Sequence, residues 1–375
     1  MQRPQYNVMS ETTMSTNLDS YRQDQQKWQD FAYSAVESED RGSFDRHEKP
    51  RYAALLAIQY DWRESDEEFI RFLFEQEVIA RENDSFQGIG EALWLGAYLL
   101  ARFQQPKDTL LFARAKLANF DTFCGFDREF VFWALREKTE AYIFEHQPDL
   151  HNEFKNNYAS MNLDEWWENL SSRYPECEAE EKLLDLYDRG IYFGNQKLAR
   201  EYLEQWQRNE PESEHKDNIL KSAYIELGEF LKAIALTLKE LETKVTNWDR
   251  VSCLHSLLKL YSQTQDSVEG LRTIQSIDAE FKQFDNWKDI GLGRMAIHEV
   301  FEYVLSIHDV EVARTSFQIA DRWFAQMDSI AYVGLEAGWK AAQKCGFKQK
   351  MKMYKRLATE ERQRIDDEMA SIKNN

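Results

Sequence analysis

The sequence predicts an all-α protein built from packed helical hairpins. Gly and Pro are few, 14 and 6 among 375 residues, whereas strand-rich folds need many Gly- and Pro-based turns. From Leu18 onward, apolar residues recur at three- and four-residue steps, which is typical of helices with one buried stripe. No stretch of useful length alternates apolar and polar residues. Hydrophobic residues make up 43% of the chain and aromatic residues 14%, enough to bury a core.

The first part of the chain predicts a tail followed by an N-terminal helical domain. Residues 1–17 lack periodicity, and we expect them to be disordered. The helical domain is expected over residues 18–174. Its first helix would carry Tyr21, Trp28 and Phe31 on one stripe. Further helices are expected over residues 51–60, 66–80, 88–103, 106–120, 128–145 and 163–173.

Two of these expected helices carry recognisable start signals. Asp66, Glu67 and Glu68 place negative charge where the helix dipole is positive. Pro106 suits a first turn, because the amide that it lacks would have no helical acceptor there. These signals fix where the helices begin.

A second domain is expected over residues 175–375. Pro175 and a run of acidic residues interrupt the apolar rhythm near residues 171–182, and beyond them the expected helices fall into five pairs. The corners within the pairs lie near Gly194, Gly228, Asp266, Asp309 and Gly346, roughly 34 to 43 residues apart. That spacing is typical of helical repeats.

The second pair resembles a tetratricopeptide repeat (TPR). Leu220 and Tyr224 match apolar positions of its first helix, Gly228 and Phe230 match the corner, and Ala233 with Ile234 matches the entry to the second helix. The first and fourth pairs match in part, through Leu186, Ala199, Leu203, Pro211, Ala313, Phe317 and Ala320. Lys221 departs from the family, which usually has Gly or Ala there. The resemblance covers about residues 176–375.

The resemblance implies a TPR-like solenoid whose concave surface holds a protein or peptide. Small residues such as Ala199, Ala233 and Ala313 would let paired helices approach closely. From the phase within each pair, we expect the inner face to present the partner-binding residues Asp188, Tyr192, Asn218, Glu226, His298, Glu302, Glu336 and Lys340. The leading hypothesis is therefore a non-catalytic interaction module or scaffold without a cofactor.

The net charge indicates which classes of partner to expect. The chain has 66 Asp and Glu against 47 Lys and Arg, a net charge of −19. Such a surface repels phosphate backbones and anionic lipids, so we expect a basic protein or peptide rather than nucleic acid or a membrane. The longest apolar run, residues 92–101, is about half of a membrane span. A homodimer contact through the same inner face remains an open alternative.

The cysteines and the N-terminal sequence indicate a cytoplasmic protein. Cys124, Cys177, Cys253 and Cys345 lie far apart without a CxxC pair, which fits a reducing compartment and argues against a zinc knuckle. The first twenty residues contain no signal-peptide core. An alternative in the same compartment is an acidic immunity or antitoxin-type protein that neutralises a toxin.

The second alternative is a thiol- or metal-dependent enzyme. Cys124 lies in a polar corner between apolar runs, but Asp121 and Asp127 would raise the pKa of its thiol. We interpret this corner as structural, with Gly125 as a left-handed helix terminator and Asp127 as the cap of the next helix. His298 and Glu302, four residues apart on one expected helix, would need a third ligand to hold a metal.

Overall fold

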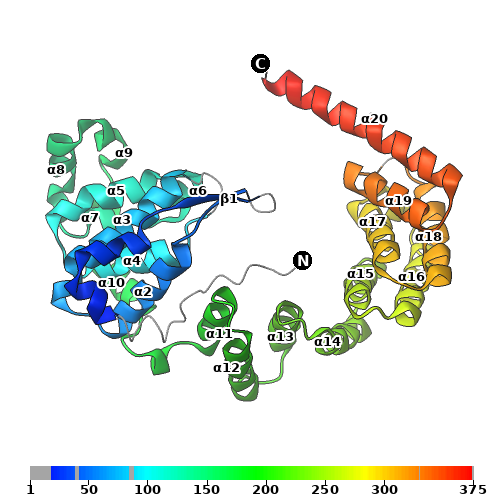
Figure 1. The fold of residues 1–375 in the computed structure, drawn as a ribbon, viewed down its shortest axis with the longest axis horizontal. Helices are drawn as coiled ribbons and strands as arrows, with labels where there is room; N and C mark the ends of the chain where they lie inside the picture. Colours follow the sequence, from blue (N-terminus) through cyan, green and yellow to red (C-terminus); the bar gives the residue numbers. More distant parts are fainter. Residues whose placement is uncertain (1–17, 39–41, 84–87, 329, 374–375) are drawn as a thin grey trace. The chain divides into compact units, whose positions relative to one another are not determined.

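The computed structural model describes residues 18–38, 42–83, 88–328 and 330–373, so the expected tail at 1–17 lies outside the described residues. The chain divides into two compact units, unit 1 (Met1–Tyr202) and unit 2 (Leu203–Asn375). Their boundary falls within helix α12 (Gln196–Asn209). The described chain is almost entirely helical, and neighbouring helices pack together (Figure 1). The all-α prediction is confirmed.

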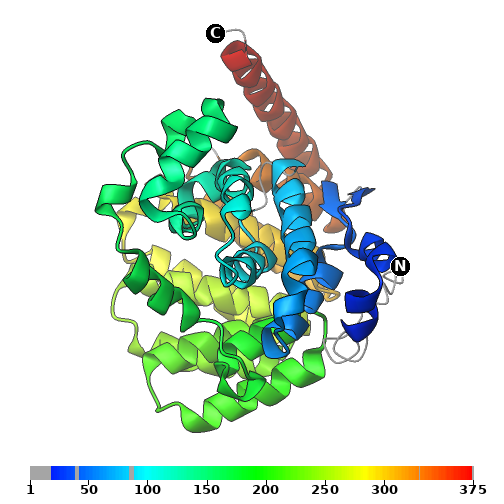
Figure 2. The ribbon, with the colours of Figure 1, turned by 90° about the vertical axis from the view of Figure 1, so that its left-hand side faces the viewer.

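Unit 1 consists of short α-helices, many of them joined by single turns of 3-10 helix, the blue to green ribbon of Figure 2. Its α-helices are α2 (Glu48–Tyr60), α3 (Glu67–Asn83), α4 (Glu91–Ala101), α5 (Thr109–Leu117), α6 (Phe120–Gly125), α7 (Glu129–Phe132), α8 (Thr139–His146), α9 (His151–Phe154), α10 (Leu163–Ser171) and α11 (Leu183–Tyr192). Its 3-10 helices are η1 (Gln25–Phe31), η2 (Glu64–Asp66), η3 (Pro106–Asp108), η4 (Arg136–Lys138), η5 (Pro148–Leu150), η6 (Tyr158–Ser160) and η7 (Glu178–Glu180).

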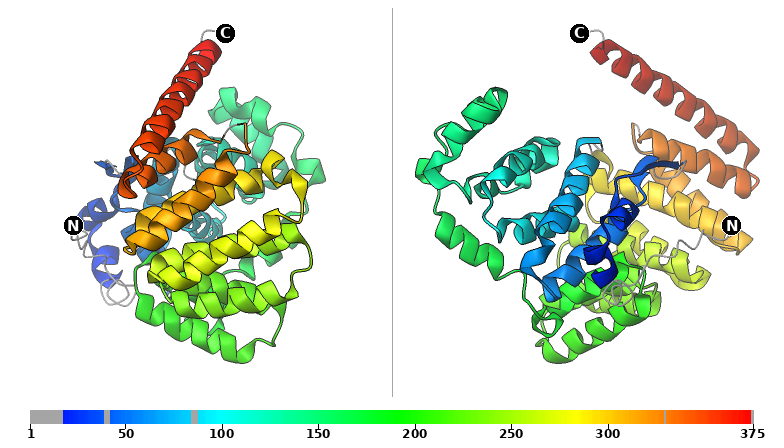
Figure 3. Two further views of the ribbon diagram at one scale, coloured as in Figure 1. Left: turned by 90° about the vertical axis from the view of Figure 1, so that its right-hand side faces the viewer. Right: turned by 60° about the vertical axis from the view of Figure 1, so that its left-hand side comes forward.

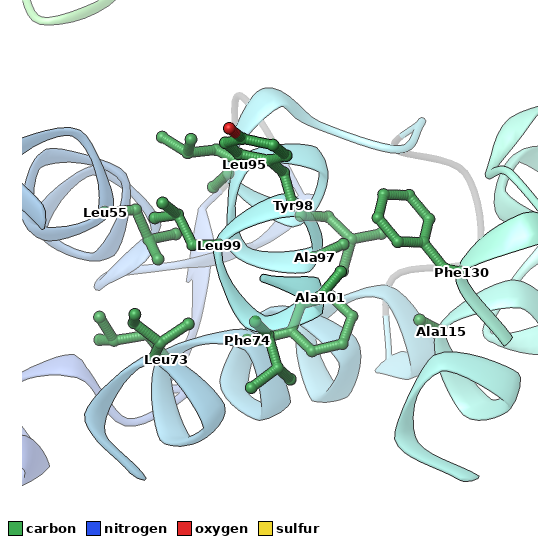
Figure 4. Close-up of a cluster of buried hydrophobic side chains, with 14 of the residues drawn as sticks. Leu55, Leu73, Phe74, Leu95, Ala97, Tyr98, Leu99, Ala101, Ala115 and Phe130 are labelled. Carbon is green, nitrogen blue, oxygen red and sulfur yellow. The ribbon is translucent and has the colours of Figure 1, made fainter. Parts of the chain in front are cut away.

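Helix α4 lies at the centre of unit 1. It is apolar on every side, and a helix of that kind must be covered all round. Leu95, Leu99 and Ala101 are buried, in contact with side chains of α2, α3, α5 and α7 (Figure 4). The longest apolar run of the sequence is therefore the core helix of this unit.

The beginning of unit 1 differs from the expected single helix. Residues 18–23 are helical, but Asp24 then caps the 3-10 helix η1 by accepting the amide of Gln26. The chain continues into an antiparallel hairpin of β1 (Ala35–Ser38) and β2 (Gly42–Asp45). The expectation of no strand is thus wrong here, because backbone pairing, not side-chain alternation, defines these four-residue strands.

A buried ion network ties this hairpin to the helices. The Arg51 guanidinium, on α2, pairs with Asp45 of β2 and with Glu77 of α3, the latter at 2.6 Å. It also donates to the backbone oxygen of Phe31. The Arg51 side chain is fully buried, and a buried charge must be paired to be tolerated. The network therefore fixes β2, η1, α2 and α3 against each other.

Unit 2 consists of longer helices that form hairpins. Its elements after α12 are α13 (Glu214–Glu226), α14 (Phe230–Thr243), α15 (Asn247–Thr264), α16 (Ser267–Phe281), η8 (Asp285–Asp289), α17 (Gly291–Ser306), α18 (Val310–Phe324), α19 (Tyr332–Lys344) and α20 (Lys348–Lys373). Helices α15, α17 and α19 pack in one layer, and α16 packs against α18 in the other (Figure 1; Figure 3, left). This stacking of neighbouring helices is compatible with a helical repeat.

The five predicted corners are where the helices turn. Gly194, Gly228 and Gly346 have φ values of 77°, 72° and 77°, the left-handed conformation that glycine adopts without steric cost. Asp266 and Asp309 instead cap α16 and α18 by accepting amides of the first turn. Local turn chemistry alone therefore placed these corners correctly.

Helix α20 extends beyond the helices that cover its first half. Tyr354 and Ala358 are buried, and Tyr354 lies against Phe301 and Phe324. Beyond Ala358, none of the side chains that the structure describes is buried. Within the described ranges, no helix is both long enough and apolar enough to cross a bilayer.

Candidate partner-binding surfaces

The eight predicted binding residues fall in three places. His298, Glu302, Glu336 and Lys340 come together on α17 and α19 of unit 2. Asn218 and Glu226 lie on α13 of the same unit. Asp188 and Tyr192 lie on α11 and line a cavity in unit 1.

The group on α17 and α19 forms two parallel stripes. His298 and Glu302 belong to one stripe, with their side chains 3.6 Å apart, and Glu336 and Lys340 to the other, 2.9 Å apart. The hydrogen bond that Lys340 donates to Glu336 raises the pKa of Lys340, and the charge of Glu302 on the neighbouring helix adds to the shift. These four side chains therefore share one charged surface, which we call the α17/α19 face.

Three exposed residues that were not predicted from the sequence continue this surface. Met295 and Val333 precede the two stripes by three residues, in the same helical phase. On α15, Lys259 extends the face, since its ammonium lies 3.7 Å from Glu299 of α17. The same i, i+3, i+7 spacing that selected the predicted residues would have found Met295 and Val333.

Unit 1 contains a cavity of about 770 Å³ around the start of α4. It lies within the range of small-ligand pockets. The lining comes from α2, α4, α11 and the segment before Pro175, and it comprises Glu48, Tyr52, Gly90, Glu91, Ala92, Trp94, Leu95, Arg173, Tyr174, Lys182, Asp185, Asp188, Arg189 and Tyr192.

Tyr192 joins α11 to α2 at this cavity. Its ring lies 5.5 Å from that of Tyr52 in an edge-to-face contact, and the Lys49 ammonium lies 4.9 Å from its centroid. Burial raises the pKa of the Tyr192 hydroxyl, and the charges of Glu48 and Glu77 raise it further. The hydroxyl therefore stays protonated.

The two remaining residues lie on α13 and do not belong to the α17/α19 face. Asn218 lines a smaller hollow of about 370 Å³ between α13 and α14. Ion pairs cross that hollow, Lys221 with Glu240 and Lys239 with Asp217. Glu226 is exposed at the end of α13.

The corner around Cys124 lies between helices, as expected, and consists of the short helix α6 and the turn that follows it. The roles of the individual residues differ in part from the expected ones. Asn119 caps α6 by accepting the amide of Thr122. Gly125 does not have positive φ; a Cβ there would lie 2.6 Å from Ile89, so close packing requires the glycine. Asp127 does not cap α7 but accepts the indole N–H of Trp166 at 2.8 Å. Both assignments for Gly125 and Asp127 are therefore corrected.

The candidate metal ligands His298 and Glu302 gain no third ligand among the described residues. Glu302 lies beside His298, and within the described ranges no group of three or more His, Cys, Asp or Glu side chains is placed to hold a metal ion. A search of protein-family models, of curated proteins and of solved structures finds no match to this chain.

Proposed function

We propose that this chain is a non-catalytic module that binds a protein or peptide. In this proposal, unit 2 is a TPR-like repeat whose α15, α17 and α19 line the binding surface. The observation that carries it is the α17/α19 face, where side chains of successive hairpins meet on one surface. Helical repeats use such surfaces to hold extended or helical segments of partners.

The composition of the α17/α19 face supports recognition of a polypeptide. Met295 and Val333 offer apolar contact, with about half of each side chain exposed. Glu302, Glu336 and Lys340 follow them along the same two helices and add charged groups. Protein interfaces commonly combine apolar contacts with neighbouring polar groups in this way.

The charge of unit 1 supports a basic partner. Unit 1 contains 38 Asp and Glu against 23 Lys and Arg, a net charge of −15. A surface of this sign raises the rate of encounter with cationic proteins. A basic toxin neutralised by an immunity-type protein would be one member of that partner class.

Site-specific crosslinking tests the surface. A photoreactive phenylalanine analogue is placed at Met295 or Val333, which are 53% and 54% exposed, or at the controls Val268 of α16 and Val310 of α18, both 57% exposed. We expect the same partner polypeptide to crosslink in cell extracts from the first two positions only. Equal crosslinking from all four positions would reject the α17/α19 face.

Charge reversal gives a second test with a matched control. Replacing Glu302 and Glu336 by Lys should weaken capture of the crosslinked partner about tenfold. Glu269→Lys with Glu311→Lys, on α16 and α18, changes the net charge equally and should leave capture unchanged. Equal loss in both double variants would show that only net charge matters.

A further inference from the structure

We propose that the cavity of unit 1 binds an organic cation, the ammonium or guanidinium group of a Lys or Arg side chain or of a free amine. All of its lining residues belong to unit 1, whereas the α17/α19 face belongs to unit 2. The inference depends on the proposed function only for the source of the cation, a partner polypeptide.

The size of the cavity fits such a group with its aliphatic stem. About 770 Å³ exceeds what one side chain needs, so flanking residues of a peptide can enter as well. The walls come from elements that strong contacts hold together. Arg189 of α11 donates to the hydroxyl of Tyr60, and Gln59 of α2 donates to the backbone oxygen of Pro175.

Aromatic rings supply one half of the cation recognition. Tyr52, Tyr174, Tyr192 and Trp94 all line the cavity, and the faces of such rings attract ammonium and guanidinium groups. Tyr192 already has the Lys49 ammonium 4.9 Å from its ring centroid. Tyr192 is thus a ring that accepts a cation on one face, although Lys49 itself lies outside the lining.

Carboxylates supply the other half. Glu48, Glu91, Asp185 and Asp188 line the cavity, against three basic residues. One of the three, Arg189, already pairs with Glu181, a residue outside the lining, at 2.8 Å. On the acidic side, Glu48 likewise pairs with Arg81, also outside the lining, at 3.9 Å, so the lining has an excess of one carboxylate. The net negative charge of unit 1 adds to the same field.

The start of α4 is the feature that would favour an anion instead. Gly90 precedes the helix without a side-chain cap, and Gly90, Glu91 and Ala92, whose amides have no acceptor within the helix, line the cavity. However, Glu91 in that first turn already supplies the negative charge that the dipole favours. The aromatic rings and the excess of carboxylates therefore decide for a cation.

Binding of a short blocked peptide, acetyl-Gly-Arg-Gly-amide, tests the inference by calorimetry. The same peptide with citrulline in place of arginine is the neutral control, since it keeps the shape and loses the charge. We expect saturable binding of the arginine peptide, at least about tenfold tighter than the citrulline peptide. Equal affinity of the two peptides, or no saturable binding up to about 10 mM, would overturn the proposal.

Variants locate the bound cation. The double variant Glu91→Gln with Asp185→Asn should weaken the arginine peptide about tenfold; among the described residues, neither carboxylate forms a hydrogen bond or ion pair that folding needs. The matched control, Glu145→Gln with Asp149→Asn, removes two exposed carboxylates of unit 1 outside the cavity and should leave binding unchanged. Equal weakening by both double variants would contradict a site in this cavity.

Agmatine and spermidine distinguish the source of the cation. Tighter binding of the peptide than of either free amine supports a partner side chain, whereas tighter binding of a free amine supports a small-molecule ligand of the same chemistry. The crosslinking test of the α17/α19 face uses unit 2 residues only. Failure of one test therefore leaves the result of the other intact.

Discussion

Unit 1 and unit 2 are both helical, but they are stabilised in different ways. Unit 1 packs many short helices around α4, and aromatic rings contact one another throughout its core, as Trp133 does with Trp167 at 4.6 Å. Unit 2 repeats one motif, a pair of longer helices with a left-handed or capped corner. The regular hairpins of unit 2 present side chains on one surface, whereas the irregular packing of short helices in unit 1 leaves a cavity that is open to solvent.

Charge separates the two units as well. Unit 2 contains 28 Asp and Glu against 24 Lys and Arg, a net charge of −4 compared with −15 in unit 1. The acidity of the whole chain is therefore mainly a property of unit 1. A basic partner would be attracted chiefly there, while the α17/α19 face would select by shape and paired charges.

The largest expected effect is the loss of the Arg51 network. Arg51→Met leaves Glu77 and Asp45 buried without their counter-ion and should lower the free energy of unfolding of unit 1 by about 3–5 kcal/mol. Hydrogen exchange followed by mass spectrometry should show lost protection in unit 1 only. Arg322→Met in unit 2 breaks an exposed pair with Asp278 and should cost less than about 1 kcal/mol. Similar losses from both variants would contradict the contrast between the units.

The second largest expected effect is a difference in thiol reactivity between the cysteines of the two units. Cys124 and Cys177 of unit 1 are exposed, whereas Cys253 and Cys345 of unit 2 are buried, and burial raises the pKa of each buried thiol to about 11. At pH 8 we expect both unit 2 cysteines to react with iodoacetamide roughly 100-fold or more slowly, because little thiolate is present. Peptide mapping of timed samples measures the four rates. In denaturant the rates should become equal, and fast labelling of native Cys253 would contradict the burial.

A smaller effect is expected from the tight packing between hairpins in unit 2. A Cβ at Gly270 of α16 would overlap the hydroxyl of Tyr303 on α17, so Gly270→Ala should destabilise unit 2 by about 1–3 kcal/mol. At Gly291 a Cβ would meet no neighbour within 4 Å, and φ there is not positive. Gly291→Ala should therefore be neutral or stabilising by up to about 1 kcal/mol. Urea titration of both variants measures the difference, and an unchanged midpoint for Gly270→Ala would show that Tyr303 can move aside.

Much of unit 2 could be predicted from the sequence because its signals are local. Gly228 and Asp309 mark corners by their own conformation or capping. Helical periodicity was enough to predict that His298, Glu302 and Lys340 lie on one surface. The repeat architecture and its concave groove remain a proposal, since only the packing of neighbouring helices is established.

Unit 1 resisted prediction where contacts are distant in sequence. The hairpin β1–β2 has too few residues to show a periodic pattern. Asp188 and Tyr192 face a cavity because Tyr192 contacts Tyr52, 140 residues earlier in the chain. No periodicity within one helix encodes such a contact. The cavity therefore had no signal in the sequence, although two of its lining residues were selected for another reason.

Beyond Arg362, whose guanidinium lies 5.5 Å from the centroid of the Tyr332 ring on α19, helix α20 must maintain its own shape. Arg362 pairs with Asp366 and Arg364 with Glu368, one turn apart, and such pairs contribute only about 0.2–0.5 kcal/mol each. The fifteen residues of α20 beyond Ala358 would reach roughly 22 Å at the helical rise. Salt screens exposed charges. Raising the ionic strength should therefore unfold the C-terminal turns of α20, while the helical hairpins of unit 2 stay folded.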